Sequence, residues 1–219
     1  DAAAGRTDVV LSALVARADG ASIGQSIAGL TVTAHPTAAL AASSVYIDFT
    51  TPAATRAFAD AATVARVPAV IGTTGLDADA EAALARLAKV APVVVAANFS
   101  LGVNIVLGVA QQIARTLGPD WDAEVVETHH RAKRDAPSGT ALAIARAIAA
   151  GRGVDYDSVK RHSRDGDIGP RPRGEIGVST VRGGDVVGEH TATFYGAGER
   201  IELGHRATSR TIFAAGALH

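Results

Sequence analysis

The sequence predicts two domains of different class: an α/β domain built on a parallel sheet, followed by an α+β domain with a mostly antiparallel sheet. Two observations support this prediction. In the first half of the chain, short apolar runs end in small polar turns and alternate with helical patterns. In the second half, one strand pattern runs into an alanine-rich helix, and three further strand patterns then follow one another with only turn residues between them. Alternating strands and helices are typical of parallel sheets with right-handed crossovers, whereas consecutive strands favour antiparallel pairing.

The parallel sheet is predicted from three units of the same design. Each is a near-continuous apolar run, as expected of a strand that is buried on both faces. The runs and their turns are 44–49 with 50–52, 68–71 with 72–75, and 92–96 with 97–100, and the helices between them are expected over 52–65 and 77–90. Ligands of such sheets bind beyond the carboxyl ends of the strands, where glycine and threonine allow close approach to the backbone. These turns therefore predict a nucleotide site, although the 72–75 turn taken alone is more typical of a plain turn.

A second candidate site lies where a strand expected over 124–128 leads towards a helix over 141–150. Ser138 is a suitable N-cap, so the amides that follow it lack partners within the helix. These amides and the positive end of the helix dipole attract an anion, and Lys133 adds a full charge. His129 or His130 can supply a proton near neutral pH. The pattern predicts a carboxylate or phosphate site beside a proton donor.

The two adjacent histidines leave alternatives open. Neighbours on an extended strand face opposite ways, so His129 and His130 should not share one pocket unless the strand breaks between them, and a structural role for one of them is an alternative. A metal site is the competing interpretation. Adjacent histidines lack the spacing of a helical zinc site and no cysteine is present, so we expect no metal.

Residues 127–140 read Glu-Thr-His-His-Arg-Ala-Lys-Arg-Asp-Ala-Pro-Ser-Gly-Thr. This run resembles the pattern Glu-x-His-His-x-x-Lys-x-Asp-x-Pro-Ser-Gly-Thr of the 4-hydroxy-tetrahydrodipicolinate (dihydrodipicolinate) reductases of bacterial lysine biosynthesis. The resemblance extends to Asp-Phe-Thr at 48–50, Gly-Thr-Thr-Gly at 72–75 and Ala-Asn-Phe-Ser at 97–100. It implies NAD(P)H-dependent reduction of 4-hydroxy-2,3,4,5-tetrahydrodipicolinate to tetrahydrodipicolinate in the diaminopimelate and lysine pathway.

The resemblance also implies a domain arrangement. Residues 1–100 with 210–219 would form a Rossmann-type dinucleotide-binding domain, and residues 101–209 a substrate-binding domain through which four copies form a homotetramer. Members of the family begin with a strand, a glycine-rich pyrophosphate loop and a helix. The residues Ala-Ala-Gly-Arg at 3–6 resemble the end of that loop, and 7–14 predict the following strand. We therefore expect the first strand, most of the loop and the first helix to be absent from this sequence, with a disordered terminus as the alternative interpretation of Gly5 and Arg6.

Roles for individual residues follow from the same resemblance. It makes His129 the proton donor and Lys133 a second charged catalytic group, with His130, Gly139 and Thr140 binding a small dicarboxylate substrate. Cofactor contacts are implied for Gly72, Thr73, Thr74, Ala96, Ala97, Asn98 and Phe99. Phe99 would lie near the nicotinamide, with core packing as its alternative role. Arg17 stands where an acidic residue would hold the adenine ribose, which favours NADPH over NADH; a solvated surface arginine is the alternative.

The composition excludes several kinds of partner. The chain has 21 basic and 22 acidic residues, so its charge gives no reason to expect a nucleic acid or an anionic membrane. No apolar run approaches the about 18 residues needed to span a bilayer. Cysteine is absent, which excludes disulfides and makes the cytoplasm the expected compartment.

Two other functions remain open at this point. One is a different Rossmann-type enzyme, such as an aspartate- or diaminopimelate-type dehydrogenase. The other is a non-catalytic binding protein, because most of the pyrophosphate loop is missing from the sequence.

Overall fold

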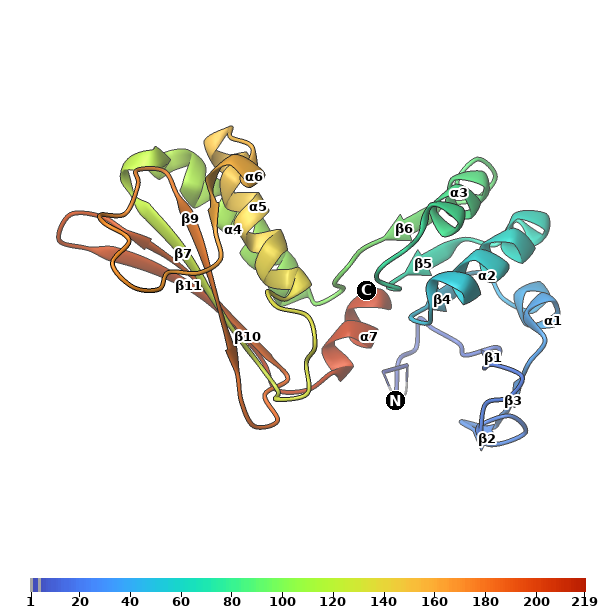
Figure 1. Ribbon diagram of the computed structural model, residues 1–219. Coiled ribbons are helices and arrows are strands. Elements are labelled where there is room, and N and C mark those ends of the chain that lie inside the picture. The colour runs from blue at the N-terminus through green and yellow to red at the C-terminus, as the bar shows by residue number, and fades with distance from the viewer. Residues whose placement is uncertain (1, 4) are drawn as a thin grey trace. The chain divides into compact units, whose positions relative to one another are not determined.

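The computed structural model describes residues 2–3 and 5–219, which form two compact units. The first unit contains the chain up to Ala97 together with residues 217–219, and the second is the continuous stretch Asn98–Gly216 (Figure 1). Each unit has its own cluster of buried apolar side chains. Among the described residues, no helix combines the length and the apolar character needed to cross a membrane.

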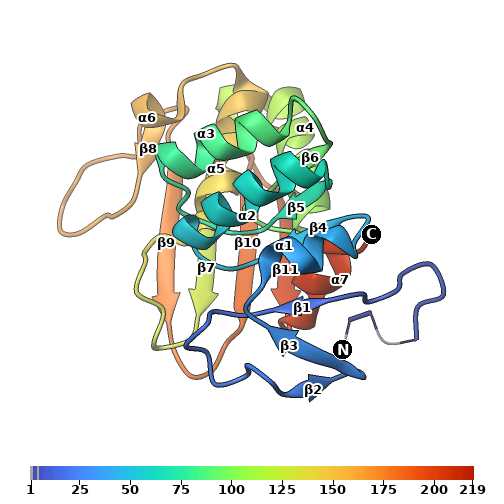
Figure 2. The same cartoon turned by 90° about the vertical axis from the view of Figure 1, so that its right-hand side faces the viewer.

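The centre of the first unit is a parallel sheet. Its strands β4 (Tyr46–Asp48), β5 (Ala69–Ile71) and β6 (Val93–Val95) lie in that order and pair in parallel. They alternate along the chain with α2 (Pro52–Ala65) and α3 (Ala78–Leu87), which pack against each other (Figure 2). Fully buried Ile71 and Leu87 belong to the apolar core of this unit. The predicted α/β class and the positions of all three strands are confirmed, but the expected burial on both faces is wrong for β6, where Val94 and Val95 are 53% and 51% exposed.

A smaller sheet precedes the parallel one. Strand β3 (Leu30–Thr33) pairs in parallel with β1 (Leu14–Val15) and antiparallel with β2 (Ser26–Ile27), and α1 (Pro36–Ala41) follows. The strand predicted over 7–14 is wrong, because only its last residue belongs to β1. Val10 is 86% exposed, and an apolar residue favours a strand only where a neighbouring strand and a face to pack against exist. Of the residues likened to the end of a glycine loop, Ala4 lies outside the described residues.

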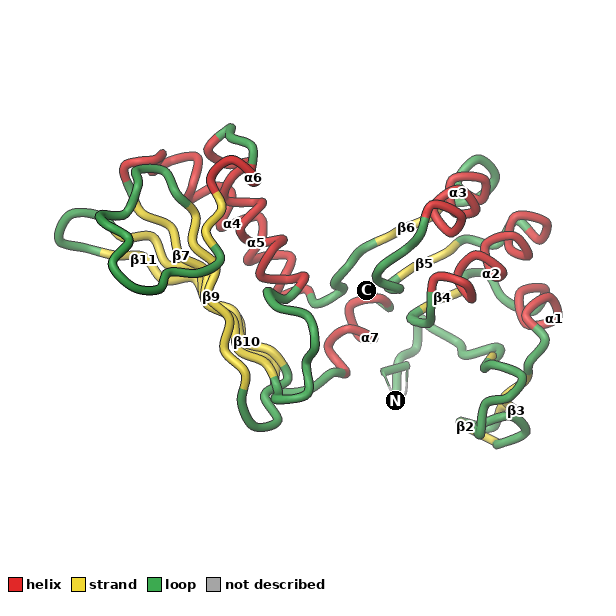
Figure 3. The backbone as a smooth tube through the Cα atoms, in the orientation of Figure 1, coloured by secondary structure: helices red, strands yellow, loops and turns green. Residues whose placement is uncertain are grey.

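The second unit is a five-stranded sheet with two long helices on one face, α4 (Leu101–Leu117) and α5 (Gly139–Arg152) (Figure 3). The strand order is β11-β10-β7-β9-β8. Their bounds are β7 Asp122–His129, β8 Lys160–Arg161, β9 Ile176–Arg182, β10 Gly188–Tyr195 and β11 Arg200–Ala207. The sheet is mixed: β7 pairs antiparallel with β10 and parallel with β9, β10 pairs antiparallel with β11, and β8 pairs in parallel with β9. The remaining elements are the short helices η1 (Gly118–Asp120), α6 (Tyr156–Val159) and α7 (Thr211–Ala217).

The pairing of β9 and β10 differs from expectation. The Gly183-Gly184 turn predicted a hairpin, but β7 lies between the two strands that the turn connects. A glycine pair specifies a turn and not the strands that pair across it. The hairpin prediction is therefore wrong, whereas the predicted α+β class of this unit is confirmed.

Close helix packing in the second unit requires a glycine. A Cβ atom added at Gly151 of α5 would lie 2.3 Å from the backbone oxygen of Gln111 and 3.0 Å from the Cβ of Ala114, both in α4. The helices therefore approach each other more closely than a side chain at position 151 would allow, and this pair covers the core side of the sheet.

Candidate active site

The candidate site begins where the helix-facing side of β7 changes from apolar to polar. Alternate residues of a strand share a face. On the face of β7 towards α5, buried Ala123 and Val125 are followed by Glu127 and His129. The register places Glu127 between His190 of β10 and Thr180 of β9. The core of the second unit thus ends in a row of polar side chains.

Glu127 is fully buried and is held by five donors. Its oxygens accept hydrogen bonds from two guanidinium nitrogens of Arg182 at 2.9 Å each, from the Thr180 hydroxyl at 3.0 Å and from the Ser138 amide at 3.0 Å. The fifth partner is Nδ1 of His129 at 2.5 Å. Burial alone raises a carboxyl pKa, but the hydrogen bonds from Arg182, His129, Ser138 and Thr180 outweigh it and lower the pKa of Glu127 to about 2. The carboxylate is therefore ionised.

An ionised Glu127 determines the state of the His129 ring. A carboxylate has only acceptors, so Nδ1 of His129 carries the hydrogen of this bond. The opposite nitrogen, Nε2, faces Gly188, where an added Cβ would lie only 2.9 Å from it. Burial lowers the pKa of His129; Glu127 opposes this shift, while Lys133 and Arg182 add to it. The ring thus presents Nε2 towards space that a side chain at position 188 would fill.

The start of α5 lies directly beside this pair. Ser138 is the N-cap, as predicted, and its hydroxyl accepts a hydrogen bond from the Ala141 amide at 3.2 Å. The same hydroxyl lies 3.0 Å from Nε2 of buried His190. Among the described residues, the amides of Gly139 and Thr140 have no hydrogen-bond partner. These two amides and the positive helix end can bind an anion.

The loop between β7 and α5 carries the other predicted charges. Lys133 is largely buried, with 20% of its side chain exposed, and its ammonium group pairs with Asp135 at 2.8 Å. The hydrogen bond from Lys133 lowers the pKa of Asp135. The chain leaves β7 after His129, and the ring of His130 lies 3.4 Å from the guanidinium of Arg210. His130 and Lys133 therefore belong to the same neighbourhood as His129 without touching its ring nitrogens.

One of the predicted cofactor residues touches a predicted substrate residue. The side-chain amide of Asn98 donates to the hydroxyl of Thr140 at 3.1 Å, and its oxygen accepts from the Ser100 amide at 2.8 Å. Phe99, beside it, is partly buried, and a Cβ at Gly216 of α7 would overlap the Phe99 carbonyl oxygen. Asn98 thus joins the two groups of candidates within the second unit.

The turn after β5 is organised by a buried carboxylate that the sequence did not single out. Asp48 accepts hydrogen bonds from the amide and hydroxyl of Thr50 at 2.9 and 2.6 Å, and from the Thr55 hydroxyl at 2.6 Å. The Thr73 hydroxyl in turn accepts from the Thr50 amide and lies 2.9 Å from the Thr55 hydroxyl. Gly72 packs so closely on the Phe49 ring that an added Cβ would overlap it. Asp48 therefore holds the ends of β4 and β5 together.

The other predicted cofactor residues lie on the surface of the first unit. Thr74 follows Thr73 and is exposed, and Ala96 and Ala97 follow β6. Arg17 follows β1, its side chain is 78% exposed, and its nearest charged partner is Asp19 at 3.6 Å. The structure does not bring Arg17 into contact with the 72–74 turn. Residues 72–74 and 96–97 do share the carboxyl edge of one parallel sheet, where Thr74 and Ala97 are exposed, whereas Thr73 is buried and the amides of Gly72 and Ala96 already donate to Asp48 and Ile71.

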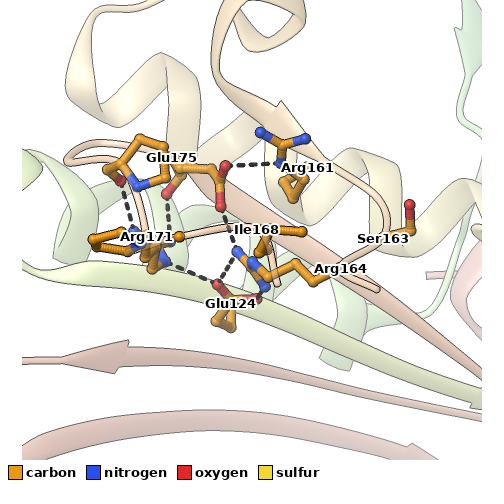
Figure 4. A pocket seen from close by; sticks show the side chains of 10 residues that line it. Glu124, Arg161, Ser163, Arg164, Ile168, Arg171 and Glu175 are labelled. Atoms are coloured by element: carbon orange, nitrogen blue, oxygen red, sulfur yellow. Dashed lines mark hydrogen bonds and ion pairs between the residues drawn. The ribbon is translucent and has the colours of Figure 1, made fainter. Parts of the chain in front are cut away.

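A separate pocket in the second unit is closed by ion pairs (Figure 4). Arg161 and Arg164 bind Glu175 at 2.9 and 2.5 Å, and Arg164 and Arg171 bind Glu124 at 2.8 and 3.1 Å. Each of the three guanidinium groups is thus paired with a carboxylate of this chain. The cluster attaches the loop before β9 to the sheet, and it leaves no unpaired cation here for a ligand.

The role of Glu127 beside His129, and the residues that hold Glu127, were missed by the sequence analysis. Glu127 was recognised as part of a pattern, but no role was assigned to it, and neither Thr180 nor Arg182 was singled out for the site. One signal was available: Glu127 and His129 are two residues apart, as are Thr180 and Arg182, so each pair shares a strand face. The register that places the two pairs side by side was not available from the sequence.

Fold and site together are those of a two-unit, Rossmann-type reductase, with a parallel sheet in one unit and, in the other, a helix start with two amides that lack partners among the described residues, beside a buried histidine. Comparison with known proteins gives the family. The family models described as dihydrodipicolinate reductase N-terminus and C-terminus match residues 1–99 and 102–219. The chain belongs to the dihydrodipicolinate reductase family.

Individual relatives agree with this assignment. The chain is 53% identical to the 4-hydroxy-tetrahydrodipicolinate reductase of Cereibacter sphaeroides over 93% of its own length and 76% of the relative's. It is 47% identical to the enzyme of the same name from Methylocella silvestris, over 95% of its length and 80% of the relative's. A solved structure, dipicolinate-bound dihydrodipicolinate reductase from Paenisporosarcina sp. TG-14, superposes with a TM-score of 0.78 at 26% identity, covering 99% of this chain and 85% of that one. The family predicted from residues 127–140 is confirmed.

Proposed function

We propose that this chain reduces 4-hydroxy-tetrahydrodipicolinate to tetrahydrodipicolinate with NAD(P)H, and that His129 donates the proton. In the overall reaction one hydride and one proton are added to the substrate and one water leaves. The buried Glu127–His129 pair beside the start of α5, in a chain of this family, is the observation that carries the assignment. It supplies a proton donor next to an anion site, and the nicotinamide cofactor, when bound, supplies the hydride.

The substrate residues are proposed from the same helix start. A substrate carboxylate would accept hydrogen bonds from the amides of Gly139 and Thr140, and the Thr140 hydroxyl would add a third contact. Lys133 and His130 would bind the substrate's remaining negative charge, with Lys133 also stabilising charge that develops during the reaction. The described relative from Paenisporosarcina binds dipicolinate, which carries two carboxylates. That ligand supports a dicarboxylate pocket.

The cofactor residues are proposed at the carboxyl edge of the parallel sheet. Gly72, Thr73 and Thr74 would contact the nucleotide after β5, and Ala96 to Phe99 would contact it after β6. The proposal rests on the position of these residues at the carboxyl ends of β5 and β6 and on the exposure of Thr74 and Gly75 in the turn after β5. Residues 1–97 with 217–219 would then be the nucleotide-binding unit and residues 98–216 the substrate-binding one.

The proposed activity can be tested by the fall in NADPH absorbance with enzymatically generated 4-hydroxy-tetrahydrodipicolinate. We expect turnover that saturates in both substrate and cofactor. Turnover of aspartate or diaminopimelate instead would favour another amino-acid dehydrogenase. Binding of dipicolinate in calorimetry without any cofactor binding would favour the non-catalytic function.

A preference for NADPH is expected from Arg17. Its exposed guanidinium can bind the 2′-phosphate, and a charge-assisted hydrogen bond is worth about 1.5–3 kcal/mol, so Arg17→Ala should raise the KM for NADPH by roughly tenfold or more. The KM for NADH should stay within about twofold, since NADH has no phosphate at this position. Steady-state kinetics with both cofactors measures this. A wild-type preference for NADH, or equal effects on both cofactors, would refute the role of Arg17.

A homotetramer in the cytoplasm is proposed from the family resemblance and from the open face of the second unit's sheet. On the face of β7, β9 and β10 that points away from the helices, three apolar or aromatic residues each have 40% or more of their surface exposed: Val126, Val181 and Tyr195. Burying such side chains between copies would stabilise an oligomer by about 25 cal/mol per Å². We expect Val126→Asp to lower the mass measured by sedimentation equilibrium, whereas Val64→Asp, an equally polar change at an exposed helix position, should leave it unchanged.

A further inference from the structure

The fully buried carboxylate of Glu127 has no direct part in the proposed reaction, yet it touches the residue that does. We propose that Glu127 is the positioning residue of this site: it holds Nδ1–H of His129 towards its own carboxylate, so that the doubly protonated ring gives the substrate its Nε2 proton and is left as the neutral Nδ1–H form. This proposal rests on the proposed function, in which His129 is the proton donor.

The geometry around Glu127 leaves the carboxylate no freedom to turn. One oxygen, Oε2, accepts from His129 and from one nitrogen of Arg182. The other, Oε1, accepts from the second nitrogen of Arg182, from the Ser138 amide and from the Thr180 hydroxyl. Five donors thus use the roughly four lone-pair sites of one carboxylate. A rotation that released His129 would break bonds to three separate elements.

The same contacts link the proton donor to the anion site. The Ser138 amide, which Glu127 engages, is the last one before the unpaired amides of Gly139 and Thr140. Glu127 therefore sets the distance between the His129 ring and the helix start through a single rigid group. A carboxylate that only neutralised Arg182 would need neither the bond to His129 nor the bond to Ser138.

The contribution of Glu127 to the pKa of His129 depends on all the titratable and charged groups that face the His129 ring. They come from four places: Glu127 on β7, Arg182 on β9, His190 on β10 and Lys133 in the loop after β7. Of these groups only Glu127 is an anion. Without it, a protonated His129 would face burial and positive charge alone. The pKa of His129 is therefore expected to fall further when this charge is removed.

The central test is Glu127→Gln, which keeps the shape and removes the charge. A glutamine has one acceptor oxygen for the five donors, so it cannot hold both Arg182 and the Nδ1–H form of His129. We expect kcat to fall by about 10²-fold or more, since misplaced proton donation forfeits most of a general acid's contribution. The KM for substrate should change less than about threefold, because the amides of Gly139 and Thr140 remain. The decline of kcat/KM at high pH should begin about 1–3 pH units lower than in the wild type.

A matched control exists on the same sheet. Glu175 is also buried, with 7% of its surface exposed, and also pairs with two arginines, but it belongs to the ion-pair cluster before β9. Glu175→Gln should therefore affect stability without moving the pH profile of kcat/KM. If both substitutions changed the profile equally, a general loss of structure would explain the result and the positioning role would be refuted.

A measurement without turnover separates this proposal from the proposed function. In protein labelled with ¹⁵N at histidine, the His129 signals are assigned by their loss in His129→Gln. The doubly protonated ring donates from Nε2, so we expect the neutral wild-type ring, once that proton has left, to be the Nδ1–H form, and Glu127→Gln to shift the neutral ring towards the Nε2–H form. An active wild type whose His129 form and pH profile are the same in Glu127→Gln would overturn the positioning role. An inactive wild type with the expected spectra would instead overturn the proposed function alone.

If Glu127→Gln does not fold, Glu127→Asp provides the test. This change keeps the negative charge but moves the carboxylate away from His129 by one methylene group. We expect kcat to fall by about tenfold or more, while kcat/KM begins to decline at nearly the same high pH as in the wild type. Wild-type turnover in Glu127→Asp would show that the placement of this carboxylate does not matter, and the proposal would fail.

Discussion

Replacing His129 with glutamine is expected to lower kcat by about 10²- to 10⁴-fold, the usual contribution of a positioned general acid. Glutamine keeps a polar side chain next to Glu127 but cannot release a proton near neutral pH. Because Lys133 and the amides of Gly139 and Thr140 are unchanged, the KM for substrate should stay within about threefold. Steady-state kinetics at saturating NADPH gives both constants.

The matched control for this loss is His35→Gln, since His35 is an exposed histidine in the first unit, just before α1. It should turn over as the wild type does. Normal turnover of His129→Gln would assign the proton to another group, and His130 would be the next residue to test.

Replacing Arg182 with methionine is expected to lower the free energy of unfolding of the second unit by about 3–5 kcal/mol, the usual cost of leaving a buried charge without its partner. Arg182 supplies two of the five hydrogen bonds to fully buried Glu127, and methionine fills similar volume without a charge. Urea unfolding near neutral pH measures the loss. Adding Glu127→Gln should recover part of it, because the unpaired charge is then removed.

The effect of Arg182→Met should depend on pH in a definite direction. The pKa of Glu127 is about 2 in the folded protein, below the about 4.3 of an unfolded chain, a difference worth about 3 kcal/mol. This stabilisation is fully present above the unfolded pKa and is lost as the pH falls through the folded one. The difference in the free energy of unfolding between wild type and Arg182→Met should therefore be largest above about pH 4.5 and shrink towards pH 2. A difference in unfolding free energy that stays constant over this window would show that Arg182 stabilises the fold through packing and its bonds to the carbonyls of Asp135 and Val181, and not through the charge of Glu127.

Local signals in the sequence were sufficient for the elements that carry the candidate residues. Ser138 was predicted as an N-cap from residue type and the helical run after it, and its hydroxyl does cap α5. The three apolar runs before 50–52, 72–75 and 97–100 were predicted as parallel strands, and they are β4, β5 and β6. Both successes depend on interactions within a few residues or on an apolar run bounded by turn residues, which the sequence displays directly.

Interactions between distant segments could not be predicted in the same way. Arg182 and Thr180 reach Glu127 across neighbouring strands of the sheet, and only the register of β7 and β9 brings them together. The glycine pair at 183–184 indicated a turn but not that β7 separates the strands it joins. Residues 7–14 had the residue types of a strand but, among the described residues, no strand beside most of them. The roles of the individual site residues remain predictions that the experiments above address.

The two separate apolar clusters have a consequence for how this protein melts. One cluster belongs to the continuous stretch 98–216, and the other belongs to the unit that takes in the first part of the chain and its last three residues. Chains with more than one such core commonly lose cooperativity on heating, so a single midpoint does not describe them. A calorimetric scan is then the sum of two endotherms, and only the one from the second core reports on the surroundings of Glu127.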